Sequence, residues 1–230
     1  MALPILNDTP KYDMKIPSTG KRIKYRPYLV REEKVLMIAN ESKDLKQIIS
    51  AIEDTILACT NNKIDINSLT TFDLEYLFIK IRAKSVGESI NLSLPCGECK
   101  ERNDVTLNLD NVICPSVEKE NILEISKTVS VEMKYPSYSE IEQSEDNEDT
   151  VFSIVASCLK CVISDGERID LVDEPKEAIR TFLDSMTHEQ FSKIGNFVKN
   201  LPKVTHNIEF DCSNCEEHNT IEVAGVQSFF

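Results

Sequence analysis

The sequence predicts a mixed α+β fold, in which a helical body is joined to two Cys-x-x-Cys β-hairpins that pair into one small sheet, behind an extended N-terminal arm. Apolar residues recur at spacings of three and four in several segments, which is the period of an amphipathic helix. In others apolar and polar residues alternate, which is the period of a strand, and both Cys-x-x-Cys turns lie inside such runs. The expected segments are an extended docking arm (1–30), a helical segment (31–87), a first hairpin (88–110), strands and a helical body (111–203), and a second hairpin with a C-terminal tail (204–230).

The N-terminal arm is rich in proline and carries a local excess of positive charge. Four prolines before residue 30 predict that no regular structure forms there, while the apolar and aromatic residues between them suit docking on the chain's own body or on another chain. Residues 1–34 hold eight basic and four acidic side chains, although the formal net charge of the chain is −13. The acidic remainder repels phosphate backbones, and the arm either binds an acidic partner or is an ordinary solvated surface.

Two helices are expected in the helical segment. One runs from about Asp44 to Cys59, and a second begins near Thr70, with Asp73 placing a negative charge in its first turn. The apolar residues of 35–39 fit a short helix or a strand. Between the two hairpins, "ILEISKTVSVEMKYPS" predicts strands, and the acidic run 140–149 predicts a solvated helix start or a loop.

Three more helices are expected before the second hairpin. The first covers "DTVFSIVASCLKCVIS", so that Cys158 and Cys161 lie in a helical pattern and are expected to be core residues rather than metal ligands. The second has Pro175 in its first turn, and the third begins with a capping box from Thr187 to Gln190.

An internal repeat relates the two Cys-x-x-Cys hairpins. A shift of 116 residues superposes Cys212 on Cys96 and Cys215 on Cys99, and the apolar flanks superpose as well. Four thiolates presented by two such turns are the complement of a structural zinc ribbon. We therefore expect Cys96, Cys99, Cys212 and Cys215 to bind one structural zinc ion in a zinc-ribbon-like sheet.

Several alternatives to this site stay open. The hairpins can be reduced and metal-free, or never meet, and a site of three cysteines and one histidine can use His206 or His218. Four cysteines close the zinc shell, whereas a catalytic zinc keeps an open position. Neither cysteine pair opens a helix after a strand, so a thioredoxin-like redox role is not indicated.

Signs of catalysis, membrane insertion or secretion are weak. The sequence has no complete phosphate-binding loop, since "PSTGK" lacks the first glycine, and it has three histidines with no evident nucleophile beside them. No apolar run approaches the roughly 20 residues of a membrane span, and the N-terminus has no signal-peptide pattern. We expect a non-enzymatic protein of the cytoplasm with reduced cysteines.

Three features together carry a family resemblance: "PSTGK" leading into "RPYLVREEKVLMIANES", two Cys-x-x-Cys hairpins around a helical body, and the end "VAGVQSFF". The chain resembles the baseplate hub and hub-assembly proteins of T4-type contractile-tailed bacteriophages. The resemblance implies a late viral protein that helps to build the central hub of the tail baseplate, as a component, an assembly chaperone or both. Its partners would be other hub or tail proteins, found in the host cytoplasm during assembly or in the virion tail baseplate.

The resemblance transfers no catalytic residue. It marks "PSTGK" and "RPYLVREEK" as candidate docking surface, and Phe229 and Phe230 either meet a partner or fold onto the chain's own core. The main alternative is a nucleic-acid-binding zinc-ribbon protein, such as a late transcription accessory factor. It would need basic and aromatic residues on the ribbon, where "CSNCEEHNTIE" is acidic. A metalloenzyme is the second alternative.

Overall fold

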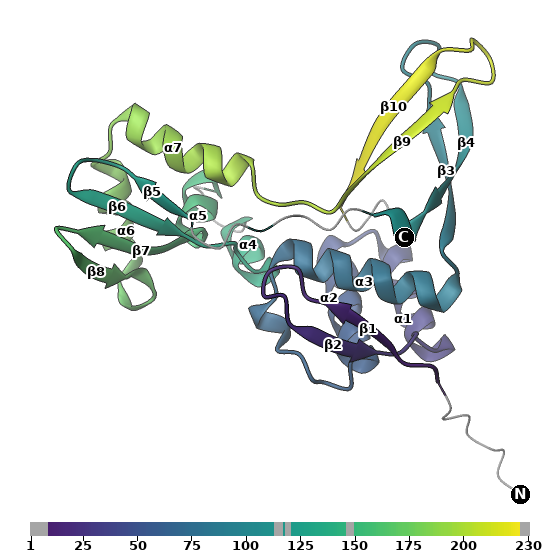
Figure 1. The fold of residues 1–230 in the computed structure, drawn as a ribbon, viewed down its shortest axis with the longest axis horizontal. Helices are drawn as coiled ribbons and strands as arrows, with labels where there is room; N and C mark the ends of the chain where they lie inside the picture. Colours follow the sequence, from purple (N-terminus) through teal and green to yellow (C-terminus); the bar gives the residue numbers. More distant parts are fainter. Residues whose placement is uncertain (1–8, 113–116, 118–120, 146–149, 226–230) are drawn as a thin grey trace, which may run out of the picture. The chain divides into compact units, whose positions relative to one another are not determined.

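The computed structural model describes residues 9–112, 117, 121–145 and 150–225, and it confirms the mixed α+β class (Figure 1). The chain forms two compact units, which we describe separately. The first unit comprises Met1–Ile66, Phe72–Pro115 and Lys203–Phe230, and the second comprises Asn67–Thr71 and Ser116–Pro202. Among the described residues, no helix is both long enough and apolar enough to cross a membrane.

The first unit combines a helical layer with three separate antiparallel hairpins (Figure 1). The helices are α1 (Val30–Ser42), α2 (Leu45–Cys59) and α3 (Thr71–Val86), with the short 3-10 turn η2 (Leu109–Asn111). A further 3-10 turn, η1 (Ile66–Ser68), begins at the last residue of the first segment of this unit. The strands are β1 (Tyr12–Lys15), β2 (Arg22–Tyr25), β3 (Ser89–Pro95), β4 (Arg102–Asn108), β9 (Thr205–Asp211) and β10 (His218–Ala224).

Helices α2 and α3 supply most of the large side chains that are fully buried in the described part of this unit. The two helices match the sequence prediction closely, and Asp44 caps α2 by accepting a 2.9 Å hydrogen bond from the backbone N–H of Lys46. Residues 35–39, for which helix and strand were both open, belong to α1. Many of the fully buried side chains of α2 and α3 lie three or four residues from another one in the same helix, as expected for amphipathic helices. They include Ile52, Ile56, Phe72, Leu74, Leu77, Phe78 and Ile81.

The prediction of an N-terminal arm without regular structure was wrong for residues 12–25. Strands β1 and β2 pair from Tyr12↔Tyr25 to Lys15↔Arg22, and the connecting turn contains Pro17. Proline is compatible with this hairpin because it lies in the turn and outside the strands, where no ladder N–H is needed. The residues of one face are buried, with Met14, Ile16, Ile23 and Tyr25 each less than a tenth exposed.

The hairpin is docked on the chain's own helices. The backbone N–H and the hydroxyl of Ser18 donate hydrogen bonds to the two carboxylate oxygens of Asp73 on α3, at 2.8 and 2.5 Å. Further along, the N–H of Arg26 donates to the carbonyl of Cys59, and the N–H of Tyr28 donates to the Ser85 hydroxyl. Of the two docking options left open by the sequence, the described part of the arm thus uses its own body.

We expect Asp73→Ala to loosen this hairpin. The Asp73 side chain is fully buried, and its removal leaves two Ser18 donors without their acceptor, at a cost of about 1–3 kcal/mol. Amide hydrogen exchange in β1 and β2 should accelerate by roughly tenfold or more. Asp54→Ala, at an exposed position of α2, is the matched control and should leave these amides protected. Equal protection in the two variants would contradict the assignment.

The second unit is built on one antiparallel sheet of strand order β5-β6-β7-β8 (Figure 1). Helices α4 and α5 connect β6 to β7, and the later helices follow β8 in the chain. The strands are β5 (Ile122–Glu124), β6 (Val129–Met133), β7 (Leu159–Ser164) and β8 (Glu167–Asp170). The helices are α4 (Tyr138–Glu145), α5 (Thr150–Ser157), α6 (Lys176–Asp184) and α7 (His188–Lys199), with the 3-10 turn η3 (Leu171–Asp173).

Several sequence predictions are confirmed in this unit. Strands β5 and β6 fall in "ILEISKTVSVEMKYPS", and α7 begins with the expected capping box. The helix expected at Pro175 is α6, although Pro175 is its N-cap and not part of its first turn. In that box the Thr187 N–H donates to the Gln190 side chain at 2.8 Å, and the Gln190 N–H donates back to the Thr187 hydroxyl. The acidic run starts within α4, and its positions 146–149 lie outside the described residues.

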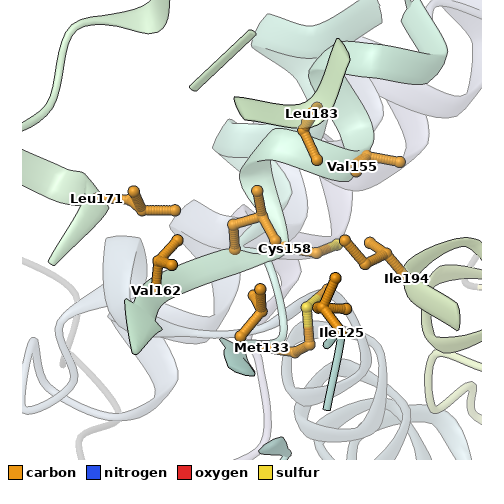
Figure 2. Packing of buried hydrophobic residues seen from close by; sticks show 10 residues of the cluster. Ile125, Met133, Val155, Cys158, Val162, Leu171, Leu183 and Ile194 are labelled. Carbon is orange, nitrogen blue, oxygen red and sulfur yellow. The ribbon is translucent and has the colours of Figure 1, made fainter. Parts of the chain in front are cut away.

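The prediction of a helix over "DTVFSIVASCLKCVIS" was wrong for the C-terminal half of this segment. Helix α5 ends at Ser157, and Leu159–Ser164 form β7, which pairs with β6 through Val131↔Val162. The β-branched Val162 and Ile163 favour a strand, and the neighbouring strands supply the pairing that the local pattern does not reveal. The expected burial of Cys158 is nevertheless confirmed, because its side chain lies in the apolar cluster of Figure 2, among Ile125, Met133, Val155, Leu183 and Ile194.

A charged group on the sheet predicts a pH-dependent stability. The Glu132 carboxylate accepts hydrogen bonds from Lys160 at 2.6 Å and from Arg168 at 2.5 Å, which lower its pKa to about 2. Because the folded-state pKa is depressed, the stabilisation is complete above the ordinary carboxyl pKa and is lost as the pH falls towards 2. Glu132→Gln should lower the free energy of unfolding by about 1 kcal/mol at pH 7, since both cations are half exposed and screened.

The measurement is urea unfolding of the wild type and the variant at several pH values. The difference between them should close between about pH 4 and pH 2. Glu167→Gln, at an exposed position of β8, is the control and should not change the pH profile. A difference that is the same at pH 7 and at pH 2 would refute the electrostatic origin.

Candidate metal centre

Two β-hairpins of the first unit carry the Cys-x-x-Cys turns (Figure 1). Strands β3 and β4 pair from Ser89↔Asn108 to Pro95↔Arg102, and the turn between them holds Cys96 and Cys99. Strands β9 and β10 pair over their whole length in the same antiparallel way, and their turn holds Cys212 and Cys215. The alternation that predicts strands on both sides of each cysteine pair is confirmed. The prediction that the two hairpins pair into one sheet was wrong, because β3–β4 and β9–β10 form two separate two-stranded sheets among the described residues.

The two turns have the same backbone structure. In the first, the N–H of Cys96 donates to the carbonyl of Glu101 at 2.8 Å, and in the second, the N–H of Cys212 donates to the carbonyl of Glu217 at 2.9 Å. The residue after each second cysteine is left-handed, with φ of 64° at Lys100 and 59° at Glu216. The 116-residue repeat therefore extends from the sequence to the turn geometry.

The structure brings the four predicted cysteines together. Their sulfur atoms all lie within 4.8 Å of one another, with 3.7 Å between Cys96 and Cys215 and 3.6 Å between Cys99 and Cys212. Bonds of about 2.3 Å to a tetrahedral zinc place two sulfurs about 3.8 Å apart, so the spacing fits such a shell. The sulfurs of one close pair come from residues 113 apart in sequence, a proximity that local structure alone cannot produce.

Backbone N–H groups at the turns favour thiolates. Those of Cys215 and Asn214 donate to the Cys212 sulfur and lower the pKa of this thiol to about 6. The pKa of Cys96 is lowered in the same way, first of all by the N–H of Cys99. Hydrogen bonds to the charged form of a group have this effect because they stabilise the anion.

The thiol of Cys215 shows that the cluster needs a cation. The N–H of Glu217 lowers the pKa of Cys215, but the neighbouring thiols, Cys99 first among them, raise it to about 12. Adjacent sulfurs cannot all become anions without a cation between them, since each new negative charge opposes the next. A thiophilic divalent cation removes this obstacle, so the donor set suits a metal of the zinc type.

The sequence interpretation missed two asparagines that touch the sulfurs. Asn103 donates to the Cys212 sulfur and Asn219 donates to the Cys96 sulfur, both at 3.6 Å, and both side chains are buried. A shift of 116 residues superposes these two asparagines on each other. The repeat was therefore a signal that could have identified them.

Other cysteines and histidines of the described residues stand apart from this cluster. Cys59 and Cys158 are buried, and burial raises the pKa of their thiols to about 12 and about 11. His206 contacts the carbonyl of Asn111 through Nδ1, and His218 pairs with an exposed aspartate. The geometry thus favours four cysteines over three cysteines and a histidine, and Cys114 lies outside the described residues.

Comparison with known proteins identifies one family. The family described as "T4 bacteriophage base plate protein" matches residues 9–230, which is nearly the whole chain. No curated protein and no solved structure matches the chain. The match includes both cysteine hairpins and the helical segments of both units.

Proposed function

The chain belongs to the T4 bacteriophage base plate protein family, and on this premise we propose that it acts in assembly of the central hub of the baseplate, as a structural or chaperone-like protein with one structural zinc ion. Family membership supports a structural role in a phage baseplate. The observation that carries the proposal is that this match spans the chain. The hub location, the chaperone role and the zinc ion are our own inferences.

The cysteine cluster supports the zinc part of the proposal. Cys96, Cys99, Cys212 and Cys215 would hold the ion, and four sulfur ligands leave no position for substrate or water. The ion would join two hairpins whose own two-stranded sheets are marginal in isolation. X-ray absorption of the purified chain tests this site: four sulfur neighbours are expected, and an oxygen ligand would indicate the metalloenzyme instead.

Exposed apolar side chains on α1 support a function through protein contacts. Val35, Met37 and Ile38 are about half to two-thirds exposed, in the segment that follows "RPYLVREEK". Exposed apolar groups that lie close together are typical of protein interaction sites. In contrast, Ser18 of "PSTGK" is bonded to Asp73 of the same chain, which leaves less of that turn for a partner.

Affinity purification of the tagged chain from infected cells, combined with mass spectrometry of mature particles, tests the assembly role. We expect other baseplate hub or tail proteins to copurify. Presence in mature particles would indicate a permanent component, and absence from them would indicate a chaperone that leaves before completion. Recovery without any phage partner would overturn the proposed role.

A pair of matched variants sharpens this experiment. Ile38→Glu places a charge among the exposed apolar groups of α1, whereas Asn40→Glu places the same charge at an exposed polar position of the same helix. We expect Ile38→Glu alone to reduce the recovery of phage partners. Equal recovery with the two variants would remove α1 from the contact surface.

The charge of the second hairpin argues against the nucleic-acid-binding alternative. Between Thr205 and Ala224 the second hairpin has five acidic side chains and no lysine or arginine. Such a surface repels a phosphate backbone. Retention on DNA or RNA at low salt would revive this alternative, and we expect none.

A further inference from the structure

Asn219 crosses from its own hairpin to the turn of the other. Its Nδ2 donates to the Cys96 sulfur at 3.6 Å, and its Oδ1 accepts a 2.8 Å hydrogen bond from the backbone N–H of Gly97. The same Nδ2 also donates to the carbonyl of Glu217 at 2.8 Å, within its own turn. One amide group thus connects both turns and one sulfur.

Asn103 makes the reciprocal contacts. Its Nδ2 donates to the Cys212 sulfur at 3.6 Å and to the carbonyl of Glu101 at 3.0 Å. Its Oδ1 accepts hydrogen bonds from the backbone N–H and the hydroxyl of Ser213, at 2.8 and 3.0 Å. The two asparagines therefore form a symmetrical pair of links, and each one serves the first cysteine of the opposite turn.

Burial shows that these are not incidental surface contacts. The exposed fraction is 6% for Asn103 and 7% for Asn219, and a buried amide is costly unless its polar atoms are hydrogen-bonded. Here each oxygen and each nitrogen has partners. An N–H donor beside a sulfur stabilises the thiolate over the thiol, and hydrogen bonds to an ionised group are stronger than those between neutral groups.

We propose that Asn103 and Asn219 are positioning residues of the metal site, which hold the two turns in register and stabilise the thiolates of Cys212 and Cys96. This inference rests on the zinc ion proposed above. It adds that Asn103 and Asn219, which are not ligands themselves, help the chain to keep the ion bound. The partners around metal ligands commonly change metal affinity by about 10- to 100-fold when they are removed. The asparagines should act mainly by slowing metal loss.

The test measures the rate at which zinc passes from the full-length chain to a chromogenic chelator. Asn103→Ala and Asn219→Ala should each release zinc about tenfold faster than the wild type, or more. Asn91→Ala and Asn207→Ala are the matched controls, since these asparagines are also related by the 116-residue shift, lie on the same hairpins and are exposed. Both controls should release zinc at the wild-type rate.

An aspartate variant separates the effect on the sulfur from the link between the turns. Asn219→Asp keeps an oxygen that can accept from the Gly97 N–H, but it removes the donor to Cys96 and places a negative charge there. Zinc release should then be faster than with Asn219→Ala. Loading the chain with cobalt gives a sulfur-to-cobalt charge-transfer band. This band should shift in Asn219→Ala and in Asn219→Asp, and it should not shift in the controls Asn91→Ala and Asn207→Ala.

The outcomes distinguish this inference from the proposed function. A wild-type chain that binds neither zinc nor cobalt overturns the metal site and the inference with it. If the wild type binds zinc and the alanine variants release it at the wild-type rate, the inference alone fails. A third outcome is that Asn219→Ala releases zinc faster than the wild type, while Asn219→Asp releases it at the wild-type rate and leaves the charge-transfer band unshifted. This outcome overturns the role of Asn219 at the Cys96 sulfur.

Discussion

Cys212→Ser should abolish stoichiometric zinc binding and destabilise the first unit. The variant replaces a thiolate with a poor zinc ligand, so the shell cannot close. Zinc content should fall from one per chain to near zero. The free energy of unfolding should fall by about 4 kcal/mol or more, which is the stabilisation that a ligand gives at about 1,000 times its Kd. Amide exchange should accelerate first in β3, β4, β9 and β10.

Two controls accompany this variant. The wild type, after treatment with a chelator, should melt at the same temperature as Cys212→Ser, because both have lost the zinc ion. Cys158→Ser alters a buried cysteine of the second unit and should retain one zinc per chain, although it also lowers stability. Wild-type zinc content and melting in Cys212→Ser would refute the four-cysteine site.

Ile194→Ala should strongly destabilise the second unit and leave the metal site intact. Ile194 on α7 is fully buried in the cluster that includes Val131 and Leu159. Truncation of a buried isoleucine removes apolar contacts and opens a cavity, which costs about 2–5 kcal/mol. Amide exchange in β6 and β7 should accelerate, whereas zinc content should stay at one per chain because all four cysteines belong to the first unit.

The matched control for this variant is Ile169→Ala on β8. Its side chain is 43% exposed, so the same truncation should cost about 1 kcal/mol, which is less than at Ile194. Similar losses of stability in Ile169→Ala and Ile194→Ala would show that α7 does not contribute to the core as the structure indicates. Loss of zinc in Ile194→Ala would show that the two units do not unfold separately.

The errors of the sequence interpretation have a common physical origin. Residues 12–25 were expected to be irregular because of their prolines, yet they form a hairpin whose buried face packs against the rest of the first unit. Residues 159–164 were expected to continue a helix, yet they pair with β6. In both cases contacts outside the segment contribute. Strand β7 pairs with β6, and the hairpin of β1 and β2, whose strands pair with each other, is docked through Ser18 on Asp73 of α3. Local propensity does not contain these contacts.

The elements with strong local signals were predictable. Helix α2 is an amphipathic segment with a capping aspartate, and α7 begins with a capping box, so the residues that specify each helix are close together in the chain. The cysteine hairpins were recognisable for a similar reason, since alternation and the Cys-x-x-Cys turn are both local. Their shared 116-residue shift added a long-range clue to the sequence interpretation.

By itself, the sequence determined the class of fold, the cysteine hairpins and the identity of the four candidate ligands. Only the tertiary structure decided that their sulfurs meet, because Cys99 and Cys212 are 113 residues apart in the sequence and no local rule sets their distance. It also decided that Asn103 and Asn219 reach across to the opposite sulfurs, since a side-chain hydrogen bond between hairpins exists only once both are placed. Short-range patterns specify elements, and packing specifies which elements come together.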